Sequence, residues 1–93
     1  MDKTEFMNTY LHILEQHKLP FVEVDASQGQ VFVPREFISE DGSIYLNISP
    51  EAIRDLKIVD GIFHCRATFK SEVFSLSFPL TNIIEIVAED EDA

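Results

Sequence analysis

The sequence is poor in the residues from which disulfides, metal sites and phosphate-binding loops are built. It has a single cysteine, Cys65, which excludes an intramolecular disulfide. With only three dispersed histidines, this cysteine does not supply the clustered ligands of a zinc site. The three glycines lie far apart, at positions 29, 42 and 61, and so form no glycine-rich phosphate loop. We therefore expect neither a metal ion nor another cofactor.

Basic residues are also scarce. The chain has seven Lys and Arg against seventeen Asp and Glu, which gives a formal net charge of −10. Such a charge opposes binding to a phosphate backbone, so nucleic acid is not an expected partner. No apolar run approaches the roughly 20 residues needed to span a bilayer, and the N-terminal MDKTEFMNTY is unlike a signal peptide. We expect a cytoplasmic protein without a membrane partner.

The composition nevertheless supports one folded domain. Hydrophobic residues make up 45% of the chain and include eight phenylalanines, whereas charged residues make up 26%. That is enough apolar surface for one core, but a second domain would leave each half too small to fold alone. We expect the domain to span residues 1–88 and residues 89–93 to begin an acidic linker or a disordered tail.

A helix is predicted near the N-terminus. Asp2 and Glu5 have the spacing of a capping box, and apolar residues recur at helical intervals from residue 6 to residue 14, before Pro20 ends the pattern. The apolar arc is wide, which leaves two interpretations open. The helix either covers its own domain with one side and meets a partner with the other, or is buried more deeply in its own domain.

After Pro20 the pattern changes to short β-branched and aromatic runs, which are typical of strands. These runs are FVEVD, QVFVP, SIYLNI, IFHCRATF, VFSLSF and IIEIV. Asp41-Gly42 and Asp60-Gly61 predict tight turns. Ser49-Pro50 predicts a short helical segment that ends near Leu56. The sequence thus predicts a mostly β fold, in which one helix precedes five or six strands of a small, partly open barrel.

No converging set of catalytic side chains is evident. Cys65 follows His64 directly, and neighbours in a strand point to opposite faces of the sheet, which separates the thiol from a possible base. We interpret Cys65 as a small core residue and His64 as an outward side chain. We therefore do not expect an enzyme.

Binding is the remaining class of function. A small β domain can pair an exposed strand edge with an extended peptide while its pockets select side chains. The basic residues Arg35, Arg66 and Lys70 lie in the middle of the chain, and the small Ala67 would let a peptide backbone approach closely. The alternative interpretation is that these basic side chains only solvate a sheet face.

The order of several segments resembles a known family. VPREF at 33–37, YLNISP at 45–50, ATF at 67–69 and SFPLTNIIEIVAED at 77–90 follow an N-terminal helix and LPFVEVD. Together they resemble stringent starvation protein B, the adaptor family that enhances the specificity of the ClpXP protease. The resemblance implies a mostly β fold: a small Sm-like open barrel with the N-terminal α-helix packed on it.

The resemblance also implies partners and contact residues. The family binds the ssrA tag, the short peptide that tmRNA adds to polypeptides from stalled ribosomes, and delivers tagged polypeptides to ClpX. Its peptide groove corresponds here to Val33, Arg35, Phe37, Cys65, Arg66, Ala67, Phe69 and Ser75. Its helix pairs two copies into a homodimer, and the matching residues here are Phe6, Met7, Tyr10, Leu11 and Leu14.

Three of the matching strand positions depart from the family pattern. Cys65 stands at the family's first Phe, Arg66 at its Asn and Thr68 at its Arg, whereas Ala67 and Phe69 agree. Because arginine in place of an amide adds positive charge at the groove, we expect Arg66 to favour an acidic tag residue.

The acidic end EDEDA resembles the start of the family's linker. In that family the linker ends in a basic and apolar segment that docks on ClpX, and a run of like charges stays extended. We expect the native chain to continue into such a ClpX-docking tail, which this sequence lacks. A solvated end that keeps the protein soluble is the alternative.

A second function stays open at this point, an Sm-like RNA-binding or assembly module, since barrels of this kind can form rings around RNA. The charge separates the two hypotheses. A protein with a net charge of −10 is not expected to bind RNA tightly even at low salt.

Overall fold

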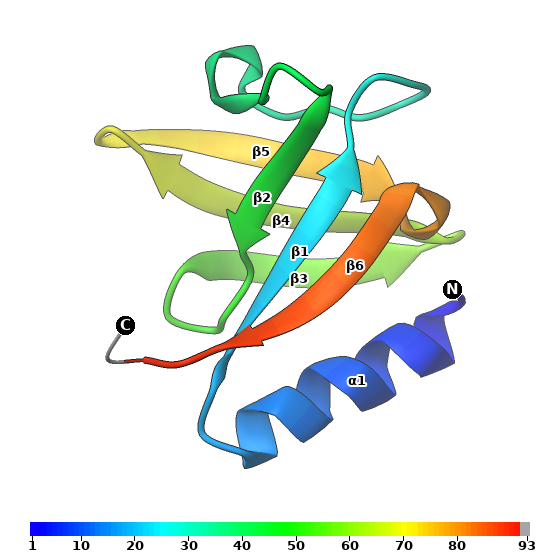
Figure 1. Cartoon of the computed structure of the whole chain (residues 1–93), viewed down its shortest axis with the longest axis vertical. Helices are drawn as coiled ribbons and strands as arrows, with labels where there is room; N and C mark the ends of the chain where they lie inside the picture. The colour runs from blue at the N-terminus through cyan, green and yellow to red at the C-terminus, as the bar shows by residue number, and fades with distance from the viewer. Residues whose placement is uncertain (92–93) are drawn as a thin grey trace.

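Residues 1–91 fold into one α-helix followed by six strands (Figure 1). The computed structural model describes residues 1–91, so the last two residues of the expected acidic linker, Asp92 and Ala93, lie outside the described residues. The elements are, in chain order, α1 (Lys3–Glu15), β1 (Leu19–Asp25), the 3-10 turn η1 (Arg35–Phe37), β2 (Ser43–Asn47), β3 (Ile53–Val59), β4 (Ile62–Phe69), β5 (Glu72–Pro79), the 3-10 turn η2 (Leu80–Asn82) and β6 (Ile83–Glu89).

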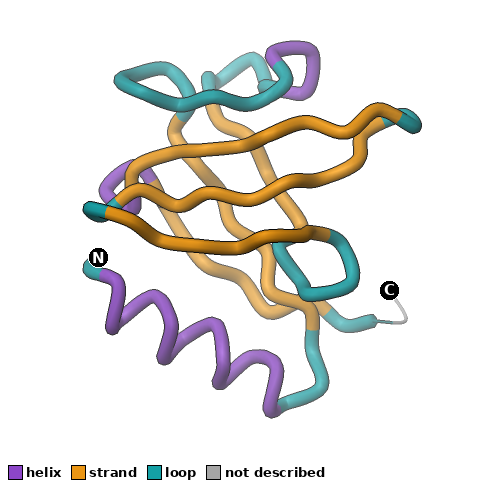
Figure 2. Tube along the Cα trace, turned by 180° about the vertical axis from the view of Figure 1, so that it is seen from behind, coloured by secondary structure: helices purple, strands orange, loops and turns teal. Residues whose placement is uncertain are grey.

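The strands form two antiparallel three-stranded sheets. One sheet has the order β2-β1-β6 and the other the order β3-β4-β5. Figure 2 shows the molecule from behind, with α1 along one side of the sheets and the loop that holds η1 at the opposite side. The two sheets do not close into a barrel, which confirms a mostly β fold of the open kind and leaves β2, β6, β3 and β5 as outer strands.

The core lies between the two sheets and under α1. Period-2 alternation in each strand turns one set of apolar side chains inward, such as Val22 and Val24 on β1. The ring of Phe63 stacks on Phe78 with centroids 4.8 Å apart and meets the edge of Phe6 from α1 at 5.5 Å. Because Phe6 is fully buried, its burial alone contributes about 1.5–3 kcal/mol to the attachment of α1.

The helix α1 begins as the sequence predicts. Asp2 accepts a hydrogen bond from the backbone N–H of Glu5, and the Glu5 side chain accepts one from the backbone N–H of Asp2. Tyr10 then donates its hydroxyl to the carbonyl of Ile48 at 2.8 Å, which fastens the helix to the segment after β2. Within residues 1–91, no helix is long and apolar enough to cross a membrane.

Two predicted elements are wrong. The QVFVP run forms no strand, only an isolated bridge between Phe32 and Ser77, because Pro34 lacks the N–H that a ladder needs and leads into η1. The helical segment after Ser49-Pro50 is only one turn, and β3 already begins at Ile53. Pairing with β4 makes this segment a strand rather than a helix, since the register places Ile53 opposite Ala67.

The predicted tight turns at Asp41-Gly42 and Asp60-Gly61 are confirmed. Gly42 has φ 87°, and the pair Asp60-Gly61 has φ 52° and 74° in the hairpin between β3 and β4. The hairpin between β4 and β5 turns through Lys70 and Ser71 instead, with φ 49° and 71°. Because neither residue is glycine, this turn has no strong signal in the sequence.

Candidate functional site

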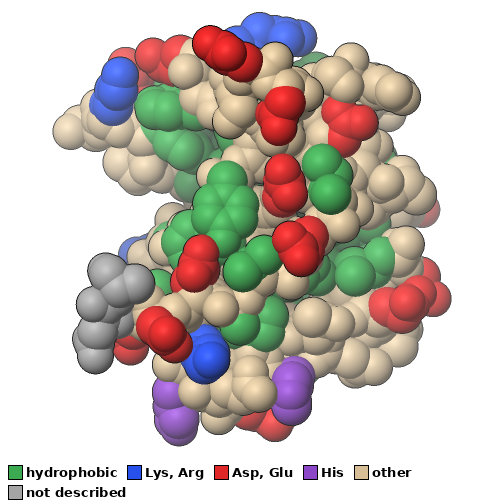
Figure 3. Space-filling view, viewed as in Figure 1, with side chains coloured by type: hydrophobic (Ala, Val, Ile, Leu, Met, Phe, Trp, Pro, Cys, Tyr) green, Lys and Arg blue, Asp and Glu red, His purple; other side chains and the backbone are tan. Residues whose placement is uncertain are grey.

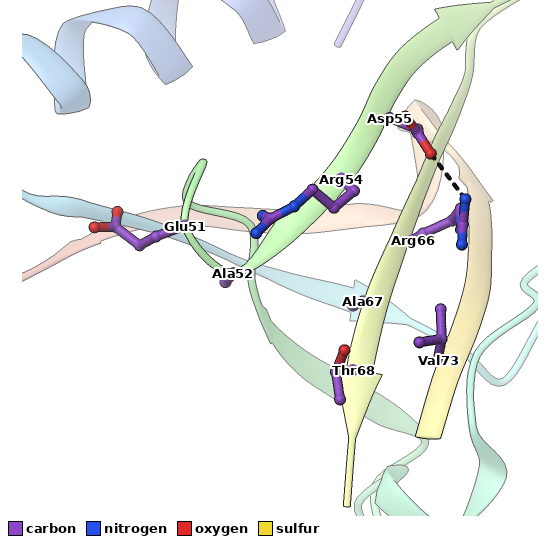
Figure 4. Close-up of a pocket in the computed structure, with 8 residues that line it drawn as sticks. All are labelled: Glu51, Ala52, Arg54, Asp55, Arg66, Ala67, Thr68 and Val73. Carbon is purple, nitrogen blue, oxygen red and sulfur yellow. Dashed lines mark hydrogen bonds and ion pairs between the residues drawn. The ribbon is translucent and has the colours of Figure 1, made fainter. Parts of the chain in front are cut away.

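The β3-β4-β5 sheet carries two adjoining hollows. The first has a volume of about 470 Å³ and is drawn in Figure 4. It is lined by Glu51, Ala52, Arg54, Asp55, Arg66, Ala67, Thr68 and Val73. The second has a volume of about 410 Å³ and is lined by Asp55, Lys57, His64, Cys65, Arg66, Ser75, Leu76 and Ser77. Asp55 and Arg66 belong to both hollows, so this pair forms the boundary between them.

A β-bulge on β3 positions Asp55. The register between β3 and β4 shifts between Arg54 and Lys57, and Asp55 takes φ 58° there. In this position its carboxylate Oδ2 lies 3.2 Å from Nη1 of Arg66 (Figure 4). Both side chains are more than half exposed, so the ion pair is screened by water and contributes about 0.2–1 kcal/mol. Arg66 can therefore exchange Asp55 for a carboxylate of a ligand at small cost.

The face around these hollows is the basic part of an acidic chain. Three of the seven Lys and Arg residues, Arg54, Lys57 and Arg66, lie on β3 and β4. The register places Arg54 and Ser75 on either side of Arg66, and His64 next to Lys57. Guanidinium, ammonium and hydroxyl groups together donate hydrogen bonds to anions. The arrangement thus suits an acidic ligand.

The outer strand β5 presents free backbone groups beside this face. Ser77 exchanges two backbone hydrogen bonds with Phe32, of 2.8 and 3.0 Å, so its N–H and C=O point away from β4. In an antiparallel ladder, alternate residues point to the same side. The N–H and C=O groups of Val73 and Ser75 are therefore directed outward as well, where an extended peptide could pair with them.

An aromatic cluster lies at the end of this edge. The ring of Phe69 is 5.0 Å from that of Phe37 and 5.7 Å from that of Phe74, measured between centroids. Lys70 holds the loop in place, with its Nζ 5.4 Å above the Phe37 ring and 3.9 Å from the carboxylate of Glu36. The loop that contains η1 therefore runs beside β5, attached at Phe32 and again at Phe37 (Figure 1).

The eight predicted groove residues fall into two groups. Cys65, Arg66, Ala67 and Ser75 line the two hollows. Phe37 and Phe69 form the aromatic cluster, and Val33 and Arg35 lie on the attached loop. The two groups lie on opposite faces of the sheet. Arg66 and Ser75 point outward, whereas Phe69 lies on the core side of β4 and packs with Phe37 against the core.

Two of the predicted groove residues have side chains that belong to the core. Cys65 is buried, as we interpreted it, and its burial raises the pKa of the thiol to about 12. Ala67 is 9% exposed and lies opposite Ile53 on one side and Phe74 on the other. A larger side chain at position 67 would thus enter the core. His64, which we interpreted as outward, is half-buried.

The residues that the sequence did not reveal come mainly from β3. Asp55 and Lys57 line the second hollow, but the bulge breaks the alternation of IRDLKIV and made the segment resemble a helical turn. Val73 was also missed, because its importance comes from the direction of its backbone rather than from its side chain. A search for one-residue breaks in apolar alternation could have found β3.

The five residues predicted for the dimer contact lie on two sides of α1. Phe6 and Tyr10 are buried in the core of the chain itself. Met7 and Leu14 are half-buried, and Leu11 is 48% exposed. Because Met7 and Leu14 still pack against the core, Leu11 is the one residue of these five that faces mainly outward.

An open strand edge beside a basic, hydroxyl-bearing face is an arrangement with which a small β domain can pair an extended peptide. Within residues 1–91, no three His, Cys, Asp or Glu side chains form a group that could hold a metal ion.

Residues 4–93 match the protein family described as SspB, stringent starvation protein B, and the chain belongs to this family. The match includes nearly the whole sequence. Family membership suggests the role of an adaptor for the ClpXP protease.

Proposed function

We propose that this chain is a non-catalytic adaptor domain that binds ssrA degradation tags and helps to deliver tagged polypeptides to the ClpXP protease. The observation that supports this most directly is the outward direction of the Val73 and Ser75 backbone groups, next to the hollow that contains Arg66. A tag bound as an added strand needs backbone partners and side-chain pockets, and this region supplies both.

In the proposed complex the tag pairs with β5 and lies between the sheet and the loop attached at Phe37. Arg66, and Arg35 from the loop, meet polar or acidic tag groups. Phe37 and Phe69 form an apolar wall. Ala67 borders the first hollow, although its small side chain turns to the core.

The magnitudes show that backbone pairing alone is not sufficient. Val73 and Ser75 offer two donors and two acceptors, and each hydrogen bond contributes a net of about 0.5–1.5 kcal/mol. Micromolar affinity requires about 8 kcal/mol after the cost of association. Contacts at the two hollows and the aromatic cluster therefore have to supply a large part of the binding free energy, which makes the tag sequence matter.

The decisive experiment replaces Ser75 by proline and, as a matched control, by alanine. Proline removes the outward N–H without breaking a bond to β4, and it is tolerated at a solvent-facing position of an outer strand. Alanine removes only the hydroxyl. In fluorescence anisotropy titrations with a labelled ssrA-type peptide, we expect Ser75→Pro to lose saturable binding and Ser75→Ala to bind within about threefold of the unmodified chain.

Circular dichroism would establish that both variants are folded. Equal binding by the folded Ser75→Pro variant would place the tag away from the β5 edge. If the folded, unmodified chain binds no ssrA-type peptide at all, the proposed function is wrong.

The preference for an acidic tag residue is a separate proposal. Arg66→Asn restores the residue type of the family pattern, and it should weaken binding of an acidic tag at low salt more than binding of its amide counterpart. Arg66 is more than half exposed, so the expected difference is about twofold to fivefold. A variant that binds the acidic tag equally well at low salt would contradict the proposal.

We also propose that two copies pair through the exposed side of α1. Leu11 is the most exposed of the apolar residues there, flanked by Met7 and Leu14. Leu11→Glu should shift the molar mass in light scattering from dimer to monomer without unfolding the chain, whereas Gln16→Glu, exposed at the end of the same helix and directed away from Leu11, should not. A monomeric unmodified chain would refute the proposed dimer.

The acidic C-terminal end is proposed to begin a tether to ClpX in the cytoplasm. The strand β6 runs to Glu89, whose carboxylate accepts a hydrogen bond of 2.6 Å from the Tyr45 hydroxyl, so the linker we propose starts at Asp90. A tether sets the effective concentration of the cargo at the protease. Adding a ClpX-docking segment after residue 93 should therefore accelerate degradation of a tagged substrate by ClpXP.

The alternative, an Sm-like RNA-binding module, has one observation in its favour, the gathering of Arg54, Lys57 and Arg66 on one sheet. The remaining charge of the chain opposes it. Tight binding of single-stranded RNA that weakens steeply with salt would favour this alternative over the adaptor.

A further inference from the structure

No helix or strand formed by residues 1–91 covers the outer face of the β2-β1-β6 sheet. The helix α1 packs on the core side, where Phe6 and Tyr10 join Val22 and Val24. The opposite side of β1 carries Phe21 and Glu23, which alternate with the core residues. Figure 3 shows this side of the molecule, with hydrophobic and acidic side chains interspersed over the sheet. This face does not overlap the hollows proposed for the tag.

The apolar part of this face is built around an aromatic pair. The rings of Phe21 and Tyr45 stack with centroids 4.9 Å apart, and Tyr45 is 47% exposed. Val87 lies directly opposite Phe21 on β6. At the β-bulge of β6, Ile84 is 57% exposed. Aromatic rings in such a position offer a flat, apolar surface with a negative face to a cation.

The charges on these three strands have one sign. The strands contain four acids, Glu23, Asp25, Glu85 and Glu89, and no Lys, Arg or His. None of these acids takes part in the three ion pairs formed among residues 1–91. The register places Glu23 directly opposite Glu85 across the β1–β6 ladder, which brings the two Cβ atoms to about 5 Å.

Like charges opposite each other destabilise a sheet, so this pair has a cost that the chain itself does not offset. The ring of Tyr45 lies beside this pair of acids, and the same charges affect the pKa of its hydroxyl. Partial burial, the hydrogen bond to Glu89 and the charges of Glu85 and Glu23 raise the pKa of Tyr45 to about 12. The acids therefore act together on one exposed ring.

We propose that this face is a docking surface for a cationic polypeptide segment in which Lys or Arg alternates with apolar residues. One cation would lie between Glu23 and Glu85 and remove their repulsion. A guanidinium group would stack on Tyr45, and an apolar side chain would cover Val87. Strands with acids alone repel phosphate groups, which makes nucleic acid and anionic lipid unsuitable occupants. The proposal goes beyond tag binding and would stand if tag binding failed.

The test uses a fluorescein-labelled peptide of alternating arginine and leucine, titrated with the full 93-residue chain in anisotropy measurements at low salt. We expect saturable binding that weakens by about tenfold in the double variant Glu23→Gln/Glu85→Gln. The matched control Asp60→Asn/Glu72→Gln removes the same charge from the β3–β4 hairpin turn and from β5, and it should bind within about twofold of the unmodified chain. Tyr45→Leu should weaken binding about threefold through loss of the cation–π contact.

Nuclear magnetic resonance of the unmodified chain gives a second measurement that does not depend on any variant. The peptide should shift the backbone amide signals of β1, β2 and β6 and leave those of β4 unchanged. Equal weakening in the two double variants would mean attraction by net charge only and would overturn the proposal. Signal shifts confined to β3, β4 and β5, or no saturable binding at low salt, would overturn it as well.

Discussion

Replacing Asp55 by asparagine should strengthen binding of an acidic tag. Asp55 is the internal partner of Arg66, at 3.2 Å, and a ligand carboxylate has to compete with it. Asparagine is the appropriate substitute because Asp55 has φ 58°, a conformation that Asn tolerates well among non-glycine residues. Alanine at this position would add backbone strain of about 1–2 kcal/mol and obscure the result.

The expected magnitude follows from the geometry of the pair. Two unit charges 3.2 Å apart in bulk water attract by about 1.3 kcal/mol. Both side chains are more than half exposed, so the measured contribution should be at the usual level of about 0.2–1 kcal/mol. Release of Arg66 should therefore tighten binding by about twofold to fivefold and lower the free energy of unfolding by less than about 1 kcal/mol.

The assay is a pair of anisotropy titrations with an acidic ssrA-type peptide and with its amide counterpart. The gain in Asp55→Asn should be confined to the acidic peptide and should disappear at high salt, where exposed charges are screened. The double variant Asp55→Asn/Arg66→Asn should show no gain. Equal or weaker binding of the acidic peptide by Asp55→Asn would refute the reasoning, since Arg66 would then not be the group that meets the ligand.

Three further predictions concern the fold. Spectrophotometric titration should show Tyr45 ionising near pH 12, and Glu89→Gln should lower this midpoint toward 10. The pKa of Tyr45 is higher in the folded chain than in the unfolded chain. The stability that the protonated hydroxyl contributes is therefore present below pH about 10 and is lost as the pH rises toward 12. Phe6→Ala should lower the free energy of unfolding by about 3–5 kcal/mol in urea denaturation, because its fully buried ring joins α1 to the sheets; a loss below about 1 kcal/mol would contradict this packing. Gly42→Ala should destabilise the chain by at least about 1 kcal/mol, since Gly42 has φ 87° and a new Cβ would lie 2.9 Å from the Cβ of Ser27; an unchanged melting temperature would contradict it.

Most of the fold could be predicted from local patterns. The capping box of α1 and the alternation in β1, β2, β4 and β5 are properties of short stretches, and they were read correctly. The errors occurred where pairing between distant segments decides the structure. Ile53 belongs to a strand because it lies opposite Ala67, and Phe32 forms only a bridge because its single partner is Ser77. Neither partner can be identified from the local sequence.

The candidate site, too, could be predicted only in part from local sequence. Arg66 and Ala67 could be named from their charge and their size, and Phe37 and Phe69 from the family resemblance. Asp55 was not, because a bulge places it beside Arg66 and alternation alone does not predict a bulge. The backbone of Val73 was missed since its direction depends on the whole register of β4 and β5. Sequence could thus name side chains but not the free strand edge between them.

Acidic and basic side chains are distributed unequally between the two sheets. The strands of one sheet carry four acids and no base, and those of the other carry three Lys or Arg and two acids. Separated charges of this kind produce a permanent electric dipole moment, superimposed on the net negative charge. A charged partner would then exert a torque on the freely tumbling protein during approach, and the β3-β4-β5 sheet would turn toward an anionic partner before contact. The two molecules would therefore meet more often in one orientation. Salt screens this long-range effect, so it would remove the preferred orientation at concentrations at which binding itself persists.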